Sequence, residues 1–443
     1  MSHVAGTPAR FPTTLVVTTA AVALLSAALA FLAPAWLREE MLRGTAVVLL
    51  VFIVVLVARY MLLLWLGYLH HVESVMADRS RDPAEEYCPP VSVLVPAYNE
   101  GVCIEPAIRA LLRMDYPAYE IIVLDDGSSD DTYDRASAFA GQWGGATVRV
   151  IRKSNSGKAA TLNYGIQVAR YPLVLCMDGD TTLTPDTLRR AARHFRHPDV
   201  AAVAGNVKVI NRQNFWARVQ ALEYIEGLNM ARRAQGFMRA VNIIPGPVGM
   251  FRREILLQLG GYDTDTFAED ADLTLKILAA GWRIVYEDRA IAWTEAPEAL
   301  LPLIKQRYRW TRGILQAMKK RKRVFVHPEN AMTWLSVLMM CFESLIWPVL
   351  NIFGTVFFVV VALSFGAGAY LLAWWLLLTL LDVAAALHTV VMEGEDLSLV
   401  PLALFYRLVF VLLIDITKLL ATAEEFMNVQ MTWGKLERLG RIG

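Results

Sequence analysis

The chain has few of the features that identify several common classes of protein. Its 443 residues include four cysteines, whose spacing fits neither a disulfide framework nor a metal site: Cys88, Cys103, Cys176 and Cys341. The net charge of +1 at pH 7 indicates no class of partner, and nothing else in the sequence supports binding to nucleic acid. The sequence also shows no internal repeats and no Walker-type phosphate loop, which disfavours ATP hydrolysis.

Long apolar runs, in contrast, are abundant. Hydrophobic residues make up 56% of the chain and the mean hydropathy is +0.39, which is too apolar for an ordinary soluble protein. A helix of about 20 apolar residues spans a membrane, and Thr14–Trp36 and Thr45–Tyr68 are both long enough. They predict an N-terminal transmembrane hairpin within residues 1–75, with a polar turn at residues 37–40.

A second apolar region predicts C-terminal membrane segments over residues 331–422. Its runs are Met332–Gly366, Ala369–Val391 and Leu402–Ala421. The number of crossings stays open, because polar residues interrupt the first run and charged residues lie in the last. If the tail, residues 423–443, is cytoplasmic, then either the first run crosses twice or one run enters and returns without spanning.

Basic residues predict that the central region is cytoplasmic. Arg79 and Arg81 follow the predicted hairpin, and the run Lys319–Arg323 precedes the next apolar segment. Basic residues are retained on the cytoplasmic side of a membrane, and such a run is typical of a juxtamembrane segment near anionic lipid. We therefore expect a multi-pass protein of the plasma (inner) membrane, with the lipid bilayer as a partner.

Residues 88–297 have the pattern of an α/β domain. Short β-rich runs alternate with helical stretches such as Cys103–Met114, which predicts βαβ units, a Rossmann-like arrangement and a mainly parallel sheet. The predicted strands are Val91–Val95, Glu120–Leu124, Thr147–Ile151 and Leu173–Met177. Ligands of open α/β sheets bind at the carboxyl ends of the strands, and three polar motifs begin where these strands end.

Five short motifs occur in a fixed order between Pro96 and Trp310. They are Pro96-Ala97-Tyr98-Asn99-Glu100, Asp125-Asp126-Gly127-Ser128, Asp178-Gly179-Asp180, Ala268-Glu269-Asp270 and Gln306-Arg307-Tyr308-Arg309-Trp310. Each motif alone could be an ordinary turn or helix cap. In this order, and enclosed by membrane segments, they resemble the membrane-bound family-2 glycosyltransferases of GT-A fold that polymerise sugars, such as synthases of cellulose, chitin, hyaluronan and poly-N-acetylglucosamine.

The resemblance implies a nucleotide-sugar site at the strand ends. Residues of the first two motifs, Ala97, Asn99, Glu100 and Asp126, would hold uridine. Asp178 would contact the nucleotide or sugar, and Asp180 would bind Mg²⁺ or Mn²⁺, hard cations that bind carboxylate and phosphate oxygens. Lys158 follows a glycine that opens a helix, where it could contact the diphosphate.

The same resemblance assigns the catalytic carboxylates. Glu269 and Asp270 match the family's Thr-Glu-Asp, with Ala268 in place of threonine, and Asp270 would take the proton from the acceptor hydroxyl. One base suffices for an inverting displacement, whereas a retaining mechanism needs a second, nucleophilic carboxylate close by. Asp272, two residues further on, is a rival for the base.

Two further segments could cover the site. Gln306, Arg309, Trp310 and Gly313 share one face of a predicted amphipathic helix within residues 298–330. Arg309 and Trp310 could face the leaving diphosphate and the sugar, or could mark an interfacial helix at headgroup depth. Trp433 in the tail, residues 423–443, resembles a tryptophan of a mobile loop in hyaluronan synthases, which predicts a gating loop.

The sequence therefore predicts a processive, inverting glycosyltransferase that joins UDP-sugars into an extracellular polysaccharide and extends it through its own membrane segments. The length and motifs look most like bacterial poly-β-1,6-N-acetylglucosamine synthase, which makes UDP-N-acetylglucosamine the expected donor and the growing polysaccharide the acceptor. A small membrane accessory subunit is compatible with this prediction, but the sequence does not identify one. The alternatives are a synthase of the hyaluronan, chitin or cellulose type, transfer of one sugar to a lipid carrier, and a transporter or scaffold with an inactive domain.

Overall fold

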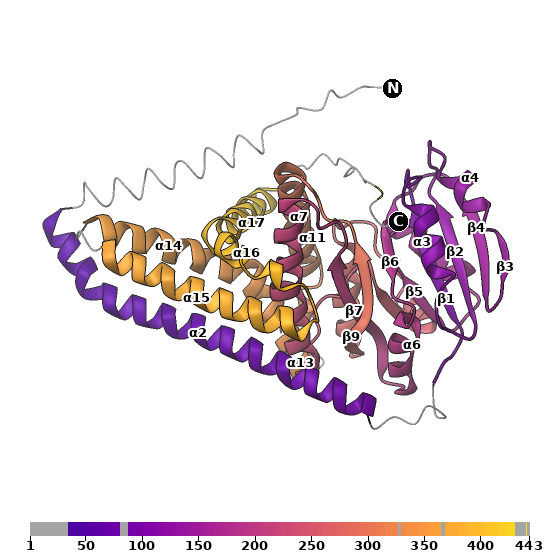
Figure 1. The fold of residues 1–443 in the computed structure, drawn as a ribbon, viewed down its shortest axis with the longest axis horizontal. Coiled ribbons are helices and arrows are strands. Elements are labelled where there is room, and N and C mark those ends of the chain that lie inside the picture. Colours follow the sequence, from indigo (N-terminus) through magenta and orange to yellow (C-terminus); the bar gives the residue numbers. More distant parts are fainter. Residues whose placement is uncertain are drawn as a thin grey trace. The chain divides into compact units, whose positions relative to one another are not determined.

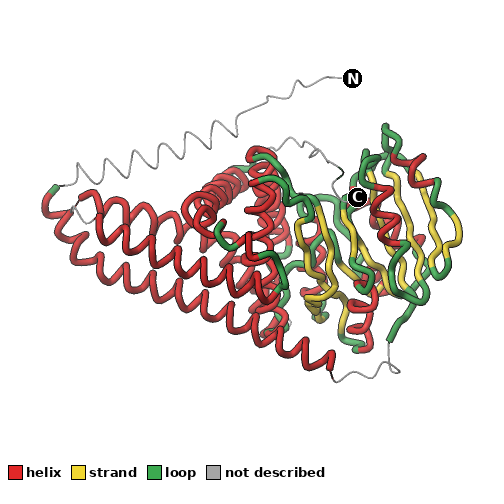
Figure 2. Tube along the Cα trace, viewed as in Figure 1, coloured by secondary structure: helices red, strands yellow, loops and turns green. Residues whose placement is uncertain are grey.

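The computed structural model describes residues 34–79, 87–326, 328, 330–364, 368–429 and 440 (Figure 1). The chain divides into two compact units. The α/β unit comprises Trp65–Glu298, Gly313–Met340 and Leu436–Gly443, and the helical unit comprises Met1–Leu64, Ala299–Arg312 and Cys341–Lys435. All strands of the described residues lie in the α/β unit, whereas the helical unit is built from helices and their connections (Figure 2).

The α/β unit contains a nine-stranded sheet of order β3-β4-β2-β1-β5-β8-β7-β9-β6. The strands are β1 (Val91–Ala97), β2 (Tyr119–Asp125), β3 (Gly141–Trp143), β4 (Ala146–Arg152), β5 (Leu173–Cys176), β6 (Thr181–Leu183), β7 (Val200–Val209), β8 (Gly249–Arg252) and β9 (Arg283–Thr294). The four predicted strands are confirmed as β1, β2, β4 and β5, which lie side by side in parallel.

The rest of the sheet differs from the prediction of a mainly parallel sheet. β8 is antiparallel to both β5 and β7, and β6 is antiparallel to β9. The sheet is therefore mixed. Its strand β7 is ten residues long and buried throughout, and it contains four small residues, so neither alternation nor a run of large β-branched residues identified it in the sequence.

Helices cover the sheet and connect its strands (Figure 1). In the α/β unit they are α3 (Ile104–Leu111), α4 (Thr132–Ser137), α5 (Lys158–Val168), α6 (Thr187–Ala192), η2 (Arg193–Arg196), α7 (Phe215–Leu222), η3 (Glu223–Asn229), α8 (Met230–Phe237), α9 (Arg253–Gln258), α10 (Glu269–Ala279) and α12 (Arg323–Val326). The core contains fully buried side chains from β1, β2, α5 and α10, among them Leu94, Ile122 and Ile277. Burying apolar surface of this kind is the main force that holds the layers together.

The end of helix α2 (Ala35–Arg79) is fixed to the α/β unit by charged groups. Asp78 forms ion pairs with Arg190 and Arg193, each at 2.7 Å, and with Arg289. Nearby, the buried Asp288 pairs with Arg233 at 2.5 Å. Because these pairs are largely shielded from water, removing one partner would leave an uncompensated charge, which is costly.

The helical unit contains η4 (Phe342–Ile346), α14 (Trp347–Ser364), α15 (Gly368–Met392), η5 (Leu397–Leu399), α16 (Leu402–Phe405), η6 (Tyr406–Phe410) and α17 (Val411–Phe426). Helices α2, α11 (Leu300–Lys320) and α13 (Ala331–Cys341) contribute to both units. Residues 37–40 lie within α2, so the turn predicted there is wrong. The first apolar segment of the predicted hairpin lies almost wholly outside the described residues.

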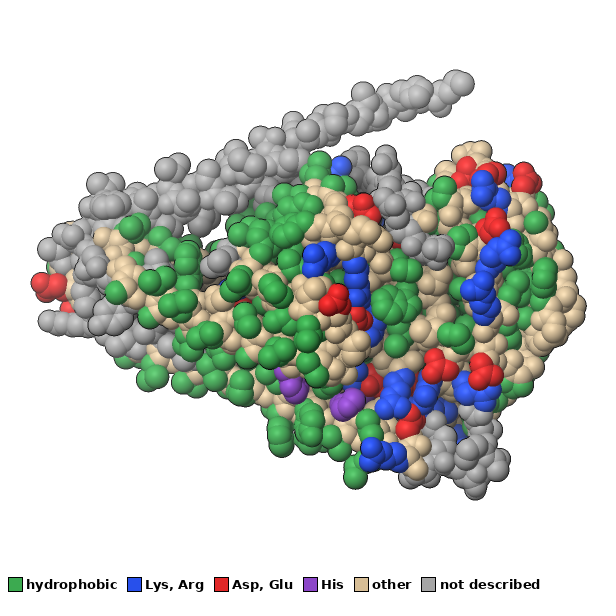
Figure 3. All heavy atoms as spheres, in the orientation of Figure 1, with side chains coloured by type: hydrophobic (Ala, Val, Ile, Leu, Met, Phe, Trp, Pro, Cys, Tyr) green, Lys and Arg blue, Asp and Glu red, His purple; other side chains and the backbone are tan. Residues whose placement is uncertain are grey.

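Three helices of the described residues are long and apolar enough to cross a membrane: Val54–Arg79, Ala331–Val360 and Trp375–Met392. Leu402–Ala421 is not among them, and it includes the charged residues Arg407, Asp415 and Lys418. In the face shown in Figure 3, hydrophobic side chains dominate the surface of α14 and α15. Leu372, Leu376 and Leu380 are more than half exposed, as expected of side chains that face lipid.

Two ion pairs lie inside the helical unit. Arg407 forms a bidentate ion pair with the fully buried Asp382, and its guanidinium also donates to the Tyr60 hydroxyl at 2.8 Å. Arg59 donates to Glu343 at 2.8 Å. Paired and inward-facing charges are the form in which ionisable residues occur within membranes.

Candidate active site

The loops after β1 and β2 are joined by hydrogen bonds at the carboxyl edge of the sheet. Asn99, whose φ of 52° is left-handed, accepts from the Ser129 backbone N–H at 2.8 Å through its side-chain oxygen. The Glu100 N–H donates to the Thr132 hydroxyl at 2.8 Å. Ala97 ends β1, and its carbonyl accepts from the Asp126 N–H at 2.9 Å. The first two motifs therefore form one continuous surface, as their positions after parallel strands predicted.

Asp126 organises the loop that leads into α5. One carboxylate oxygen accepts from Lys153 Nζ at 2.5 Å and from the Ser156 N–H at 2.9 Å, and the other accepts from the Gly157 N–H at 2.8 Å. Burial would raise the pKa of Asp126, but Lys153 and the backbone N–H groups hold it below its usual value. The carboxylate is therefore ionised at neutral pH. Lys153 is a site residue that the sequence did not identify.

Lys158 joins two acidic motifs that lie far apart in the sequence. Gly157, with a φ of 88°, ends the preceding loop, and Lys158 is the first residue of α5, as predicted. Its ammonium group lies 2.6 Å from Asp178 and 2.8 Å from Glu269. Burial would lower the pKa of Lys158, but the two carboxylates raise it above its usual value, so the amine is protonated. The group expected to meet a diphosphate thus lies between the two acidic motifs.

Asp178, Gly179 and Asp180 follow β5 after one intervening residue, Met177. A Cβ added at Gly179 would lie 3.2 Å from the Pro96 carbonyl oxygen and 3.3 Å from Glu100 Cγ, so the motif approaches the first loop more closely than most side chains allow. Asp178 is partly exposed, whereas Asp180 is only 2% exposed.

The surroundings of Asp180 are suited to a divalent cation. Burial and the negative charges of Glu295, Glu100 and Asp180 together raise the pKa of the neighbouring Cys103 thiol to about 12. The negative charges of several carboxylates therefore gather around the buried Cys103 side chain. Carboxylate oxygens are the ligands that Mg²⁺ and Mn²⁺ prefer, so the residues present fit the expected ion.

Glu269 and Asp270 occupy the first turn of α10. Burial and the charge of Glu269 raise the pKa of Asp270, and with the opposing effect of Lys158 included it reaches about 6. One Asp270 oxygen accepts from the Ala271 N–H at 2.8 Å. A carboxylate whose pKa lies near neutrality is suited to accept a proton during a reaction, because it is deprotonated at pH 7 yet more basic than an ordinary aspartate.

Asp272, the rival for the base, has a different environment. It is fully buried, and its carboxylate lies 2.9 Å from Arg321 and 3.3 Å from Lys320. A carboxylate that is fully buried and held by two cations has no exposed oxygen to meet an acceptor hydroxyl. The geometry therefore favours Asp270.

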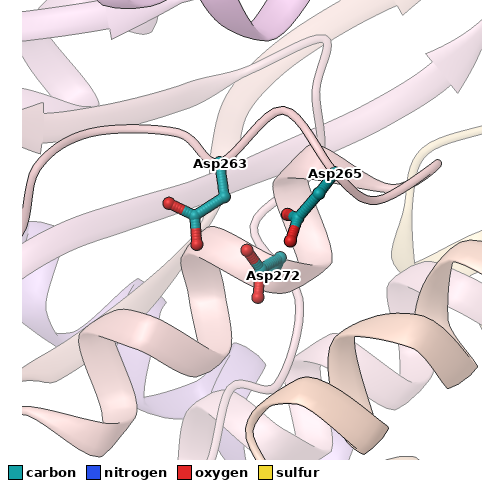
Figure 4. A group of neighbouring side chains, drawn as sticks. All are labelled: Asp263, Asp265 and Asp272. Carbon is teal, nitrogen blue, oxygen red and sulfur yellow. The ribbon is translucent and has the colours of Figure 1, made fainter.

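Three neighbouring carboxylates on the far side of this turn are drawn in Figure 4: Asp263, Asp265 and Asp272. Their spacing could suit a metal ion, but cations of the chain already face them. Lys276 lies 2.7 Å from Asp263, and Lys320 lies 2.6 Å from Asp263 and 2.5 Å from Asp265. With Arg321, three cations balance three carboxylates, so this cluster is an ion-pair network.

The donor contacts predicted in the last two segments lie outside the described part of the α/β unit. The predicted amphipathic helix is confirmed as α11, but Gln306, Arg309 and Trp310 belong to the helical unit. There the Arg307 guanidinium lies 4.1 Å from the centre of the Trp310 ring and donates to Gln306 at 2.7 Å. Trp433 lies outside the described residues.

Comparison with known proteins identifies the family. Residues 89–313, which include all five motifs, match the family described as "Glycosyltransferase like family 2". Poly-beta-1,6-N-acetyl-D-glucosamine synthases of Staphylococcus aureus (strain COL) and Staphylococcus epidermidis are each 34% identical over 224 residues, 50% of this chain and 54% of theirs. The chain thus spans about half the length of the curated relatives it matches.

The fold also has a counterpart among solved structures. The mannosyltransferase PcManGT from Pyrobaculum calidifontis, solved in complex with GDP-Man and Mn²⁺, superposes with a TM-score of 0.57 and 20% identity. The superposition covers 86% of this chain and 99% of that one. The mixed sheet with its flanking apolar helices is therefore a GT-A glycosyltransferase fold, as predicted, and the chain belongs to glycosyltransferase family 2.

Proposed function

We propose that the protein is a processive, inverting β-glycosyltransferase that uses UDP-N-acetylglucosamine to build a polysaccharide at the membrane. The observation that carries the proposal is the contact of one lysine with two motifs. Lys158 lies within 2.8 Å of both Asp178, in the expected donor-binding motif, and Glu269, beside the expected base. Groups for binding a nucleotide sugar and for activating an acceptor are thereby held in one place.

In the proposed reaction, the acceptor sugar hydroxyl loses its proton to the Asp270 carboxylate. The hydroxyl oxygen attacks the anomeric carbon of the donor, and the bond from that carbon to the diphosphate breaks, so that UDP leaves. Because attack occurs opposite the leaving group, an α-linked donor gives a β-linked product. No second carboxylate is required, which agrees with the paired state of Asp272.

Binding of the donor falls to the loops after β1, β2 and β5. The joined loops of Asn99 and Asp126 would receive uridine, and Lys158 would contribute a positive charge near the diphosphate. Asp180 would hold Mg²⁺ or Mn²⁺, which supplies positive charge to a leaving diphosphate when bound. Gln306, Arg309, Trp310 and Trp433 remain proposed contacts of the donor.

The membrane part of the proposal rests on the apolar helices. The candidate spans flank the catalytic domain in sequence, and basic residues follow it at Lys319–Arg323, which favours a cytoplasmic catalytic domain. The similarity to poly-beta-1,6-N-acetyl-D-glucosamine synthases supports N-acetylglucosamine as the sugar. Extension of the product through the helical unit is part of the same proposal.

The decisive experiment incubates the purified full-length protein with single UDP-sugars and Mg²⁺ or Mn²⁺, and measures UDP release and the length of the product. We expect UDP-N-acetylglucosamine to give a long polymer. Asp270→Asn should lower turnover by about two to four orders of magnitude, the usual contribution of proton transfer, and should retain donor binding. Products one sugar longer than the acceptor would disprove processivity, and normal turnover in Asp270→Asn would disprove the assignment of the base.

A further inference from the structure

Helix α10, which carries Glu269 and Asp270, begins without a capping side chain. Its N-cap residue is Ala268, which makes no side-chain hydrogen bond to the helix. Alanine is among the poorest N-cap residues, and replacing a capping side chain by alanine destabilises a helix. The first turn of α10 therefore needs another support if its carboxylates are to keep a fixed position.

The second half of α11 supplies contacts immediately before this turn. A Cβ added at Gly313 would lie 2.4 Å from the Ala268 backbone nitrogen and 2.5 Å from its Cβ, so the helix touches the N-cap residue itself. One turn further along, the Gln316 side-chain oxygen accepts from the Phe267 N–H at 3.1 Å. This bond satisfies a backbone donor just outside the helix, where no intrahelical partner exists.

The end of α11 also fixes the residues after Asp270. Lys320 is the last residue of the helix and Arg321 follows it, and both contact the Asp272 carboxylate, which is fully buried. Both also contact Asp263, which itself pairs with Lys276 of α10. A buried ion pair tolerates little displacement, because separating its members leaves an uncompensated charge.

We propose that Gly313, Gln316 and Arg321 are positioning residues that hold the α10 turn in place of an N-cap and so fix the carboxylate of Asp270. This inference rests on the proposed function. The contacts lie on both sides of Glu269 and Asp270, at Phe267–Ala268 and at Asp272, so the two carboxylates can shift only if one of these contacts is lost. A small displacement of a reacting group can lower a rate by up to about 100-fold.

The first test is Arg321→Gln in the full-length protein, with Arg321→Lys as the conservative variant and the exposed Lys319→Gln as the matched control. We expect Arg321→Gln to lower kcat by about tenfold and to leave KM for UDP-N-acetylglucosamine within about twofold, since the donor contacts lie elsewhere. A loosened turn admits water to Asp270, which lowers the pKa that burial has raised. The acid limb of the kcat profile should therefore move to lower pH. Arg321→Lys should recover most of the loss, and Lys319→Gln should match the wild type.

A second variant tests the close approach. Gly313→Ala inserts a Cβ where the Ala268 backbone lies, whereas a Cβ at Gly44 of α2 meets nothing within 4 Å. Gly313→Ala should reproduce the loss of kcat and the shift of the acid limb, and Gly44→Ala should change neither.

The proposal is overturned if Arg321→Gln and Gly313→Ala keep the wild-type kcat and pH profile. It is also overturned if both lose activity with an unchanged profile, since that indicates fewer folded molecules and no change at Asp270. These outcomes differ from a failure of the proposed function, in which Asp270→Asn itself would remain active or the wild type would not turn over any UDP-sugar.

Discussion

Lys158 illustrates how one side chain can influence several others at the candidate site. Its ammonium group contacts Asp178 and Glu269, and its charge opposes the rise in the pKa of Asp270 to about 6. Without this charge, the negative charges of Glu269 and Asp178 would raise the pKa of Asp270 further. The lysine is therefore expected to set the pH range of the enzyme as well as to meet the donor.

This role predicts the direction of a pH shift. The base must be deprotonated to act, so kcat of the wild type should rise as pH increases through about 6. Lys158→Met removes the charge that lowers the pKa of Asp270, and the rise should move to higher pH by about one unit. Measuring kcat from pH 5 to 9 tests this, with the exposed Lys322→Met as control. An unchanged acid limb in an active Lys158→Met variant would contradict it.

Asp180 makes a second prediction at the scale of a single residue. If this buried carboxylate binds the cation, Asp180→Asn should weaken the metal dependence of UDP binding, because the amide is a poorer ligand for a hard cation. Titration calorimetry with UDP, with and without Mn²⁺, measures the effect, and chelator should stop the wild type. Full activity in the presence of chelator would contradict the metal assignment.

At the scale of elements, two side chains of η2 hold a carboxylate of β9. The buried Glu287 lies 2.5 Å from Arg193 and 2.7 Å from His194. Burial would raise the pKa of Glu287, but His194 and Arg193 lower it to about 2. A carboxylate whose folded-state pKa is lowered stabilises the fold above its unfolded pKa, and this contribution is lost as pH falls toward the folded value.

Glu287→Gln should therefore destabilise the protein at pH 7 by about 1–3 kcal/mol, within the range for a lost buried partner. The difference from the wild type should shrink as pH falls from about 5 to 3. Thermal unfolding of the solubilised protein at several pH values provides the measurement. Glu105→Gln is a suitable control, since its pair with Arg109 is exposed and contributes little. A difference that does not change with pH would contradict the ionic account.

The elements also show how far the sequence alone could lead. The strands β1, β2, β4 and β5 were predictable because they are short apolar runs bounded by turn residues, and the polar motifs at their ends are confirmed at the carboxyl edge of the sheet. β7 was not, because its small residues give no strand pattern. The ion pairs of Lys153 and Lys158 were also hidden, since their partners are 20 to 111 residues away in the sequence.

At the scale of the whole molecule, the number of membrane crossings decides on which side the C-terminal tail lies. Two candidate spans, Ala331–Val360 and Trp375–Met392, follow the catalytic domain. If each crosses once and Leu402–Ala421 enters without spanning, which is one of the alternatives left by the sequence, the number of crossings after the catalytic domain is even. An even number of crossings returns the C-terminal tail to the side of the catalytic domain.

We therefore predict that the tail is cytoplasmic. A single cysteine placed after Gly443, in a variant without the four native cysteines, should be protected from an impermeant thiol reagent in sealed cells. A cysteine in the loop at Glu393–Asp396, between α15 and η5, is predicted to face the same reagent from outside if Trp375–Met392 and Ala331–Val360 each cross once. Labelling of the tail from outside would contradict this topology and the proposed gating role of Trp433.

The pairing of charges in the helical unit has an electrical consequence. Arg407 with Asp382 and Arg59 with Glu343 each sum to zero charge. A membrane potential does about 2.3 kcal/mol of work per elementary charge per 100 mV, but it does no net work on a neutral pair that moves as one. Movement of these two pairs during synthesis would then carry no gating current. The pairs should therefore add no voltage dependence to the rate of polymer synthesis, measured in sealed vesicles at zero and at about 100 mV.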